Sequence, residues 1–182
     1  AAIIFDEFHE RHLAGDLGLA LALDIQQQLR PELRIVIMSA TLDGAKLAQQ
    51  LDAPRLSSAG RSYPVAIQYF PARKDEALNN QCKRAIELAL LEQPGDILVF
   101  LPGRREIQAL QKLLEPLANA QLQVLPLHGD LPIEQQSQAL RPAEAGIRRV
   151  VLASNVAESS VTLPGVRVVI DSGLAREPRF DP

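Results

Sequence analysis

The chain contains few of the residues that build disulfide scaffolds, cysteine-rich metal sites or large aromatic cores. Its 182 residues include one cysteine, one methionine, two tyrosines, five phenylalanines and no tryptophan. The single cysteine, Cys82, excludes a disulfide framework and fits a reducing compartment, so we expect a cytoplasmic protein. No apolar run is long enough for a membrane span and no signal peptide is visible, so we expect no membrane partner.

A strong excess of charge is missing too. Nineteen Lys and Arg residues stand against 22 Asp and Glu residues, which gives a net charge of −3. This balance does not indicate a nucleic-acid binder, but it does not exclude one, because phosphate contacts depend on local groups. A solvated surface is the simpler interpretation of each local candidate. These candidates are the pairs Lys83–Arg84, Arg104–Arg105 and Arg148–Arg149.

Short apolar, β-branched segments alternate with longer amphipathic ones along the chain. We predict strands at 1–5, 34–38, 64–69, 97–101, 122–126, 148–153 and 166–171. We predict helices near 16–30, 43–51, 74–92, 104–118 and 132–140. Several strands are apolar on both faces and each leads into a polar loop and a helix, which predicts an α/β fold with parallel sheets covered by helices. A segment rich in Ser, Gly and Pro, 55–64, indicates a junction between two domains.

Two adjacent acids stand where the first apolar run, AAIIF, ends. Ligands of parallel sheets bind at the carboxyl ends of the strands, so the position suits a Mg²⁺–nucleotide site. Successive side chains diverge, so Asp6 can orient the Mg²⁺ shell while Glu7 polarises the water that attacks the γ-phosphate. The same two residues could equally be a turn former and a solvated acid, and this pattern alone does not decide between the two hypotheses.

A metal hydrolase is a competing hypothesis for the same loop. His9 and His12, with Asp6, could ligate a metal ion. Their spacing differs from the H-E-x-x-H pattern of zinc proteases, and no cysteine cluster supports a zinc site.

Four segments in order resemble the motifs of DExH/DEAH-box helicases. They are IIFDEFHER at 3–11, VIMSATLD at 36–43, ILVFLPGRREI at 97–107 and VVLASNVAESSVTLPGVRVVIDSGLAR at 150–176. The resemblance covers essentially the whole chain, and bacterial DEAH-box helicases of the HrpB type are the group that it favours. It implies two tandem RecA-like (P-loop NTPase) domains that bind ATP and Mg²⁺ in the cleft between them and single-stranded RNA or DNA across both.

The resemblance also implies that both domains are incomplete here. Residues 1–60 would be the C-terminal half of the first RecA-like domain, and residues 61–182 the second domain without its end. The chain has no G-x-x-x-x-G-K-[ST] segment and no arginine-rich sixth motif. We therefore expect an internal fragment of an ATP-dependent helicase that by itself binds ATP poorly and hydrolyses it negligibly.

Residue roles follow from the resemblance, position by position. In the nucleotide site, Asp6 and Glu7 keep the catalytic and metal roles argued above. His9 would link this site to the opposite domain. The residues that would couple hydrolysis to strand movement are Ser39, Thr41 and Ser160, and Thr162 would contact the ribose.

On the nucleic-acid side, the resemblance assigns the backbone contacts to Gly103, Arg104, Ser154 and Asn155. Two positions depart from the family. Pro164 stands where many members have an acid near the ribose, and Leu140 stands where relatives often have a stacking aromatic, which predicts weak nucleobase discrimination. His128 is expected to be a structural loop residue. The rival class is a non-catalytic nucleic-acid-binding or scaffold module, and the sequence predicts no particular protein partner.

Overall fold

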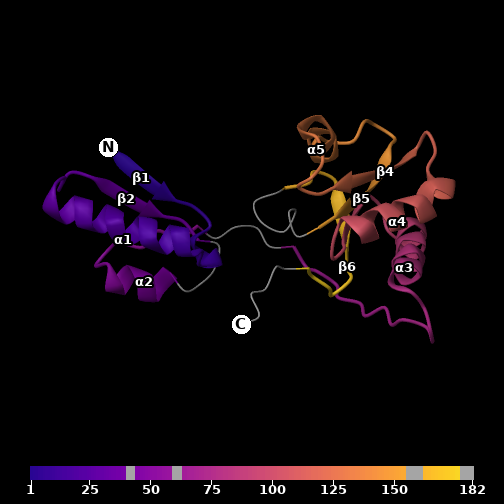
Figure 1. Ribbon diagram of the computed structural model, residues 1–182, viewed down its shortest axis with the longest axis horizontal. Helices are drawn as coiled ribbons and strands as arrows, with labels where there is room; N and C mark the ends of the chain where they lie inside the picture. Colours follow the sequence, from indigo (N-terminus) through magenta and orange to yellow (C-terminus); the bar gives the residue numbers. More distant parts are fainter. Residues whose placement is uncertain (40–43, 59–62, 155–161, 177–182) are drawn as a thin grey trace. The chain divides into compact units, whose positions relative to one another are not determined.

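The computed structural model describes residues 1–39, 44–58, 63–154 and 162–176. The chain divides into two compact units, Ala1–Val65 and Ala66–Pro182. The first contains a two-stranded sheet and the second a four-stranded sheet (Figure 1). No helix within the described ranges is long and apolar enough to cross a membrane.

In the first unit, two parallel strands are joined through a helical crossover. Strand β1 (Ala2–Phe5) pairs with β2 (Arg34–Ile37) so that Ile3 lies opposite Ile35 and Phe5 opposite Ile37. A 3₁₀ turn, η1 (Phe8–Glu10), and helix α1 (Leu13–Gln28) connect them, and α2 (Gly44–Gln50) follows. Helix α1 approaches the sheet closely at Gly18, where a Cβ would lie 3.3 Å from the Phe5 ring.

In the second unit, four parallel strands are arranged in the order β4-β5-β3-β6. Their bounds are Asp96–Phe100 for β3, Leu122–Leu127 for β4, Arg148–Ala153 for β5 and Val166–Asp171 for β6. The two central strands, β3 and β5, are buried along almost their whole length. The parallel sheet predicted from two-sided apolar strands is therefore confirmed.

Helices cover both faces of this second sheet. The helices are α3 (Leu78–Glu92), α4 (Arg104–Leu114), which continues into the 3₁₀ turn η2 (Glu115–Leu117), and α5 (Ile133–Leu140). Because strand side chains alternate, Ile97 and Val99 pack with α3 and α4, whereas Leu98 packs in a second cluster with Ala139 of α5. Figure 1 shows α5 on the opposite side of the strands from α3 and α4.

The predicted strand at 64–69 is wrong. Residues 64–69 form no strand and pair with no described segment. The side chains of Val65, Ile67 and Tyr69 are 82, 78 and 93% exposed. Alternating apolar residues indicate a capacity for β structure, but a strand also needs a neighbouring edge, and no described segment pairs with this one.

Two helix boundaries also differ from the predictions, for local reasons. Helix α3 begins at Leu78 rather than near 74, because Asp75 has a left-handed backbone (φ 57°) and the Arg73 amide donates to the Glu76 carboxylate in a turn. The helix predicted at 104–118 changes to a 3₁₀ turn after Leu114, where Pro116 cannot donate the next helical hydrogen bond.

Candidate functional site

The two acids of the first unit lie directly after β1, in a tight turn. Asp6 is exposed, and its Oδ1 accepts a hydrogen bond of 2.8 Å from the Glu7 amide. Glu7 has a left-handed backbone, with φ 50° and ψ 34°, a conformation that is uncommon for a residue other than glycine. Such backbone strain is found most often at functional sites, where the surrounding contacts hold it in place.

The contacts that hold this turn come from the next strand. The Met38 amide donates to the Phe5 carbonyl (2.8 Å), and the Phe8 amide donates to the Met38 carbonyl (3.0 Å). Phe8 is buried and meets the Phe5 ring edge to face, with centroids 6.4 Å apart. Met38 therefore fixes both ends of the acidic turn, and Ser39 follows it directly in the chain.

The two histidines of the loop interact with different carboxylates. His9 Nδ1 lies 3.4 Å from Glu7 Oε2, and both side chains are partly exposed. His12 Nε2 lies 2.7 Å from Glu10 Oε2. In the described part of the chain, no three His, Cys, Asp or Glu side chains are grouped to hold a metal ion. The zinc-site hypothesis for His9, His12 and Asp6 is therefore wrong.

A Mg²⁺ ion places a different demand on the same loop. Mg²⁺ keeps several of its water ligands and is bound through one or two carboxylates together with substrate phosphates, rather than by a closed protein cage. An exposed Asp6 carboxylate beside a partly exposed Glu7 fits this donor set. The residues that are present therefore suit a hydrated Mg²⁺ that arrives with a nucleotide.

In the second unit, the carboxyl ends of the strands meet along one edge of the sheet. Three backbone hydrogen bonds extend the ladders past the strands: Leu101 to Ala153 (2.8 Å), Ser154 to Leu127 (3.2 Å) and Ser172 to Phe100 (3.2 Å). Ser154 is 8% exposed. Ligands of parallel sheets bind at this edge.

Gly103 and Arg104 begin α4 at the same edge. Gly103 has an extended backbone (φ 175°) that any residue can adopt, and a Cβ there would meet only ordinary contacts, the nearest at 3.5 Å. Nothing in the described chain therefore requires glycine at 103. Arg104 lies 3.7 Å from Asp130, and both side chains are more than half exposed. An exposed pair of this kind is weak enough for a phosphate to displace the carboxylate.

The remaining predicted residues are placed only in part. Thr162 is exposed and lies two residues before Pro164, in the loop that leads into β6. Thr41, Asn155 and Ser160 lie outside the described residues. His128 follows β4 and is 6% exposed, and its Nδ1 has no hydrogen-bond partner among the residues that the structure describes.

The surface interpretation of the basic pairs is wrong for three arginines. Arg149 is 2% exposed and is paired with Asp96, and Arg148 donates to three backbone carbonyls. Arg84 pairs with the largely buried Glu76 at 2.7 Å. Only the pair Arg104–Arg105 is exposed at both positions. Pattern reading missed the roles of Arg148 and Arg149 because the partners of Arg148 and the carboxylate partner of Arg149 lie 53 to 58 residues away in the sequence.

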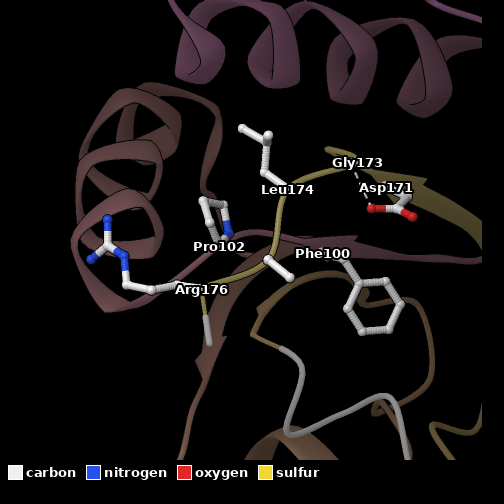
Figure 2. Close-up of a pocket in the computed structure, with 7 residues that line it drawn as sticks. Phe100, Pro102, Asp171, Gly173, Leu174 and Arg176 are labelled. Atoms are coloured by element: carbon white, nitrogen blue, oxygen red, sulfur yellow. Dashed lines mark hydrogen bonds between the residues drawn. The ribbon is translucent and has the colours of Figure 1, made fainter. Parts of the chain in front are cut away.

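A cavity of about 280 Å³ lies beside Gly103, at the carboxyl ends of β3 and β6. Figure 2 shows Asp171 and Arg176 at opposite ends of the segment that lines it. The Gly173 amide donates to Asp171 Oδ1 (2.8 Å), and Arg176 donates to Glu106 (3.2 Å). The remaining lining residues are Phe100, Pro102, Leu174 and Ala175. The sequence assigned no role to any of the seven lining residues, although the helicase-like segment 150–176 includes five of them, Asp171, Gly173, Leu174, Ala175 and Arg176.

Comparison with known families identifies this arrangement. Residues 79–181, more than half of the chain, match the family described as the helicase conserved C-terminal domain. The chain belongs to this helicase family. The matched range contains the whole four-stranded sheet of the second unit and the loops at its carboxyl edge.

Relatives of the family also match the part of the chain before residue 79. The ATP-dependent RNA helicase HrpB of Escherichia coli K12 is 45% identical over 181 residues, which are 99% of this chain and 22% of that protein. The pre-mRNA-splicing factor ATP-dependent RNA helicase prp22 of Schizosaccharomyces pombe is 36% identical over 189 residues, 100% of this chain and 16% of that protein. The chain thus spans about a fifth of the length of these two helicases.

A solved structure of the family matches the fold. The crystal structure of the Escherichia coli DEAH/RHA helicase HrpB superposes with a TM-score of 0.89 at 44% identity, over 99% of this chain and 23% of that one. The predicted RecA-like α/β class and the resemblance to DEAH-box helicases of the HrpB type are therefore confirmed.

Proposed function

We propose that this chain is the part of an ATP-dependent RNA helicase that joins ATP hydrolysis to movement along a single strand. Residues 1–60 belong to the first motor domain and residues 61–182 to the second. The observation that carries the proposal is the acidic turn after β1. Met38 is hydrogen-bonded to both ends of this turn, and Ser39 is the next residue after Met38. Both relatives are named as ATP-dependent RNA helicases, which supports the choice of ATP and RNA.

In this function, the first unit supplies the hydrolytic groups. Glu7 accepts the proton of the water that attacks the γ-phosphate. His9 Nδ1 lies 3.4 Å from Glu7 Oε2 and orients the Glu7 carboxylate. Asp6 would hold a Mg²⁺ ion through water, and the bound ion would neutralise phosphate charge. Ser39 and Thr41 couple hydrolysis to strand movement. Ser39 directly follows Met38, which is hydrogen-bonded to both ends of the acidic turn.

The second unit supplies the grip on the nucleic acid and the nucleoside contacts. Ser154, Asn155, Gly103 and Arg104 contact the sugar–phosphate backbone of the strand, which suits binding without sequence preference. Thr162 contacts the ribose, Leu140 covers the base without stacking as an aromatic would, and Ser160 senses the nucleotide state. Alternation between two grips then moves the motor from 3′ to 5′ on cytoplasmic RNA.

The test is the substitution Glu7→Gln in the full-length protein that carries this sequence. The amide keeps the size of the side chain but cannot accept the proton, so we expect kcat for ATP to fall by about 10²- to 10⁴-fold. Binding of ATP, measured by fluorescence with a labelled analogue, should be retained. Single-stranded RNA should stimulate turnover of the unaltered protein.

Glu10→Gln is the matched control. Glu10 lies three residues away in the same loop and pairs with His12 rather than with the site. It should leave turnover unchanged. Retained hydrolysis in Glu7→Gln, or equal losses in both variants, would remove Glu7 from this role, and an unaltered protein that binds RNA but not ATP would indicate a non-catalytic binding module instead.

A further inference from the structure

A buried ion pair joins the first residue of β3, Asp96, to the second residue of β5, Arg149, at the amino ends of these two parallel strands. Arg149 is 2% and Asp96 5% exposed at the side chain. Arg149 Nε and Nη2 donate to Asp96 Oδ2 at 2.8 and 2.6 Å, and the Arg149 amide donates to Asp96 Oδ1 at 2.8 Å. Charge-assisted bonds of this number hold the guanidinium in one orientation.

The rest of the guanidinium reaches two other segments. Nη2 donates to the Pro164 carbonyl at 2.8 Å, in the turn before β6. Nη1 donates to the carbonyls of Ala139 and Arg141, where α5 ends. One planar side chain therefore connects two segments that lie far apart in sequence, which the fixed fork of an arginine can do and the single ammonium of a lysine cannot.

Asp96 fixes the Pro164 turn a second time. Its amide donates to the Gly165 carbonyl at 2.9 Å, and its Oδ2 lies 3.0 Å from the position that a Cβ on Gly165 would take. Gly165 has a positive φ of 91°. The turn is therefore tied to β3 through both the backbone and the side chain of Asp96.

The two segments that this pair joins carry the proposed nucleoside contacts. Leu140 lies between Ala139 and Arg141 and is 36% exposed, and Thr162 is an exposed residue two positions before Pro164. We infer that Arg149, oriented by Asp96, is a positioning residue that sets Leu140 and Thr162 relative to each other and so determines how the base and ribose of the bound nucleotide are held. This inference rests on the proposed function.

Arg148 provides a matched comparison in the same strand. It points to the other face of the sheet and donates to the carbonyls of Leu90, Gln93 and Gly95, each at 2.8 Å. These carbonyls lie at and after the end of α3, a helix that carries none of the proposed site residues. The Arg148 side chain donates three hydrogen bonds and the Arg149 side chain five, and only Arg149 is bonded to the segments of Leu140 and Thr162.

The experiment compares Arg149→Lys with Arg148→Lys in the full-length protein. Both variants should lower Tm, because each loses carbonyl contacts that lysine cannot span. The loss should be larger for Arg149→Lys, which also weakens the buried pair with Asp96. Only Arg149→Lys should raise the KM for ATP and the Kd of a non-hydrolysable ATP analogue, each by about tenfold, the size of effect that the loss of one good hydrogen bond produces. Its kcat at saturating ATP should change less than about twofold, because the nucleoside is bound alike before and during the reaction.

A second variant, Asp96→Asn, keeps the inference testable if Arg149→Lys folds poorly. The amide retains the volume but removes the charge that orients Arg149, so ATP affinity should weaken in the same direction while the Kd of single-stranded RNA stays constant. Equal effects on ATP affinity in Arg148→Lys and Arg149→Lys, or a loss of Tm without a change in ATP affinity, would overturn the inference. If Glu7→Gln loses turnover while Arg149→Lys keeps an unchanged KM for ATP, the inference about Arg149 is overturned and the proposed function stands. If the unaltered protein does not bind ATP, the inference and the proposed function both fail.

Discussion

Arg84 holds the carboxylate of Glu76 with two hydrogen bonds, from Nε at 3.0 Å and from Nη2 at 2.7 Å. The same guanidinium donates to the Pro71 carbonyl at 3.1 Å and lies 4.2 Å from the centre of the Phe70 ring. These contacts attach residues 70–76 to α3.

The Glu76–Arg84 pair predicts a dependence of stability on pH. The hydrogen bonds from Arg84, followed by the one from the Arg73 amide, lower the pKa of Glu76 from 4.5 to about 2. A lowered pKa in the folded state stabilises the fold above pH 4.5, and this contribution is lost as the pH falls toward 2. Glu76→Gln should therefore reduce the free energy of unfolding at pH 7 and flatten its pH dependence between pH 4.5 and 2, as denaturant titrations at several pH values would show.

Glu87→Gln is the control for this prediction. Glu87 and Lys83 form an i,i+4 pair on α3 at 3.8 Å, with both side chains partly exposed. Such pairs contribute little, so the pH profile of this variant should match that of the unaltered protein. An unchanged profile in Glu76→Gln would contradict the proposed role of the Arg84 contacts.

Two glycines with the same backbone conformation allow the cost of backbone strain to be measured apart from the cost of steric crowding by a new side chain. Gly95 and Gly146 both have φ 82°, which disfavours any other residue. A Cβ on Gly95 would overlap the Arg167 side chain and lie 2.9 Å from the Gly165 carbonyl oxygen, whereas a Cβ on Gly146 would meet nothing within 4 Å.

Gly146→Ala should therefore lower the free energy of unfolding by about 1–2 kcal/mol, the cost of a left-handed alanine. Gly95→Ala should lower it by about 1–3 kcal/mol more, because a well-packed site must also move apart. Equal losses in equilibrium unfolding of the two variants would show that the Gly165 turn yields easily and does not fix the start of β3.

The sequence predicted the strands and helices of the second unit well because its signals are local. Ile97, Leu98 and Val99 are apolar on both faces of one strand, and such a run has few alternatives to a central parallel strand. The strand predicted at 64–69 failed for the opposite reason. Its alternating residues Val65 and Ile67 need a pairing edge, and no local pattern shows whether one is available.

The residues of the candidate site could be predicted where they form a recognisable sequence motif. They could not be predicted where the structure depends on a contact between segments that are distant in sequence. The adjacent acids of the first loop could be read from the chain, but their attachment to Met38 could not. Arg148 and Arg149 were interpreted as a surface pair, since adjacent charges are usually solvated. Asp96 and the Pro164 carbonyl, which bury Arg149, lie 53 and 15 residues away in the sequence.

Gly103→Ala tests whether the loop before α4 approaches a ligand. The extended backbone accepts alanine, and its Cβ would lie 3.5 Å from Glu106 Oε2 and 3.7 Å from Arg176 Nη1, so stability should change by less than about 0.5 kcal/mol. If the backbone of Gly103 packs against a phosphodiester strand, the added methyl group should weaken binding of single-stranded RNA by about tenfold, as titration with a labelled oligonucleotide measures. ATP affinity should not change in the absence of RNA. Unaltered RNA affinity would identify Gly103 as an ordinary turn residue and leave the grip of the second unit to Arg104, Ser154 and Asn155.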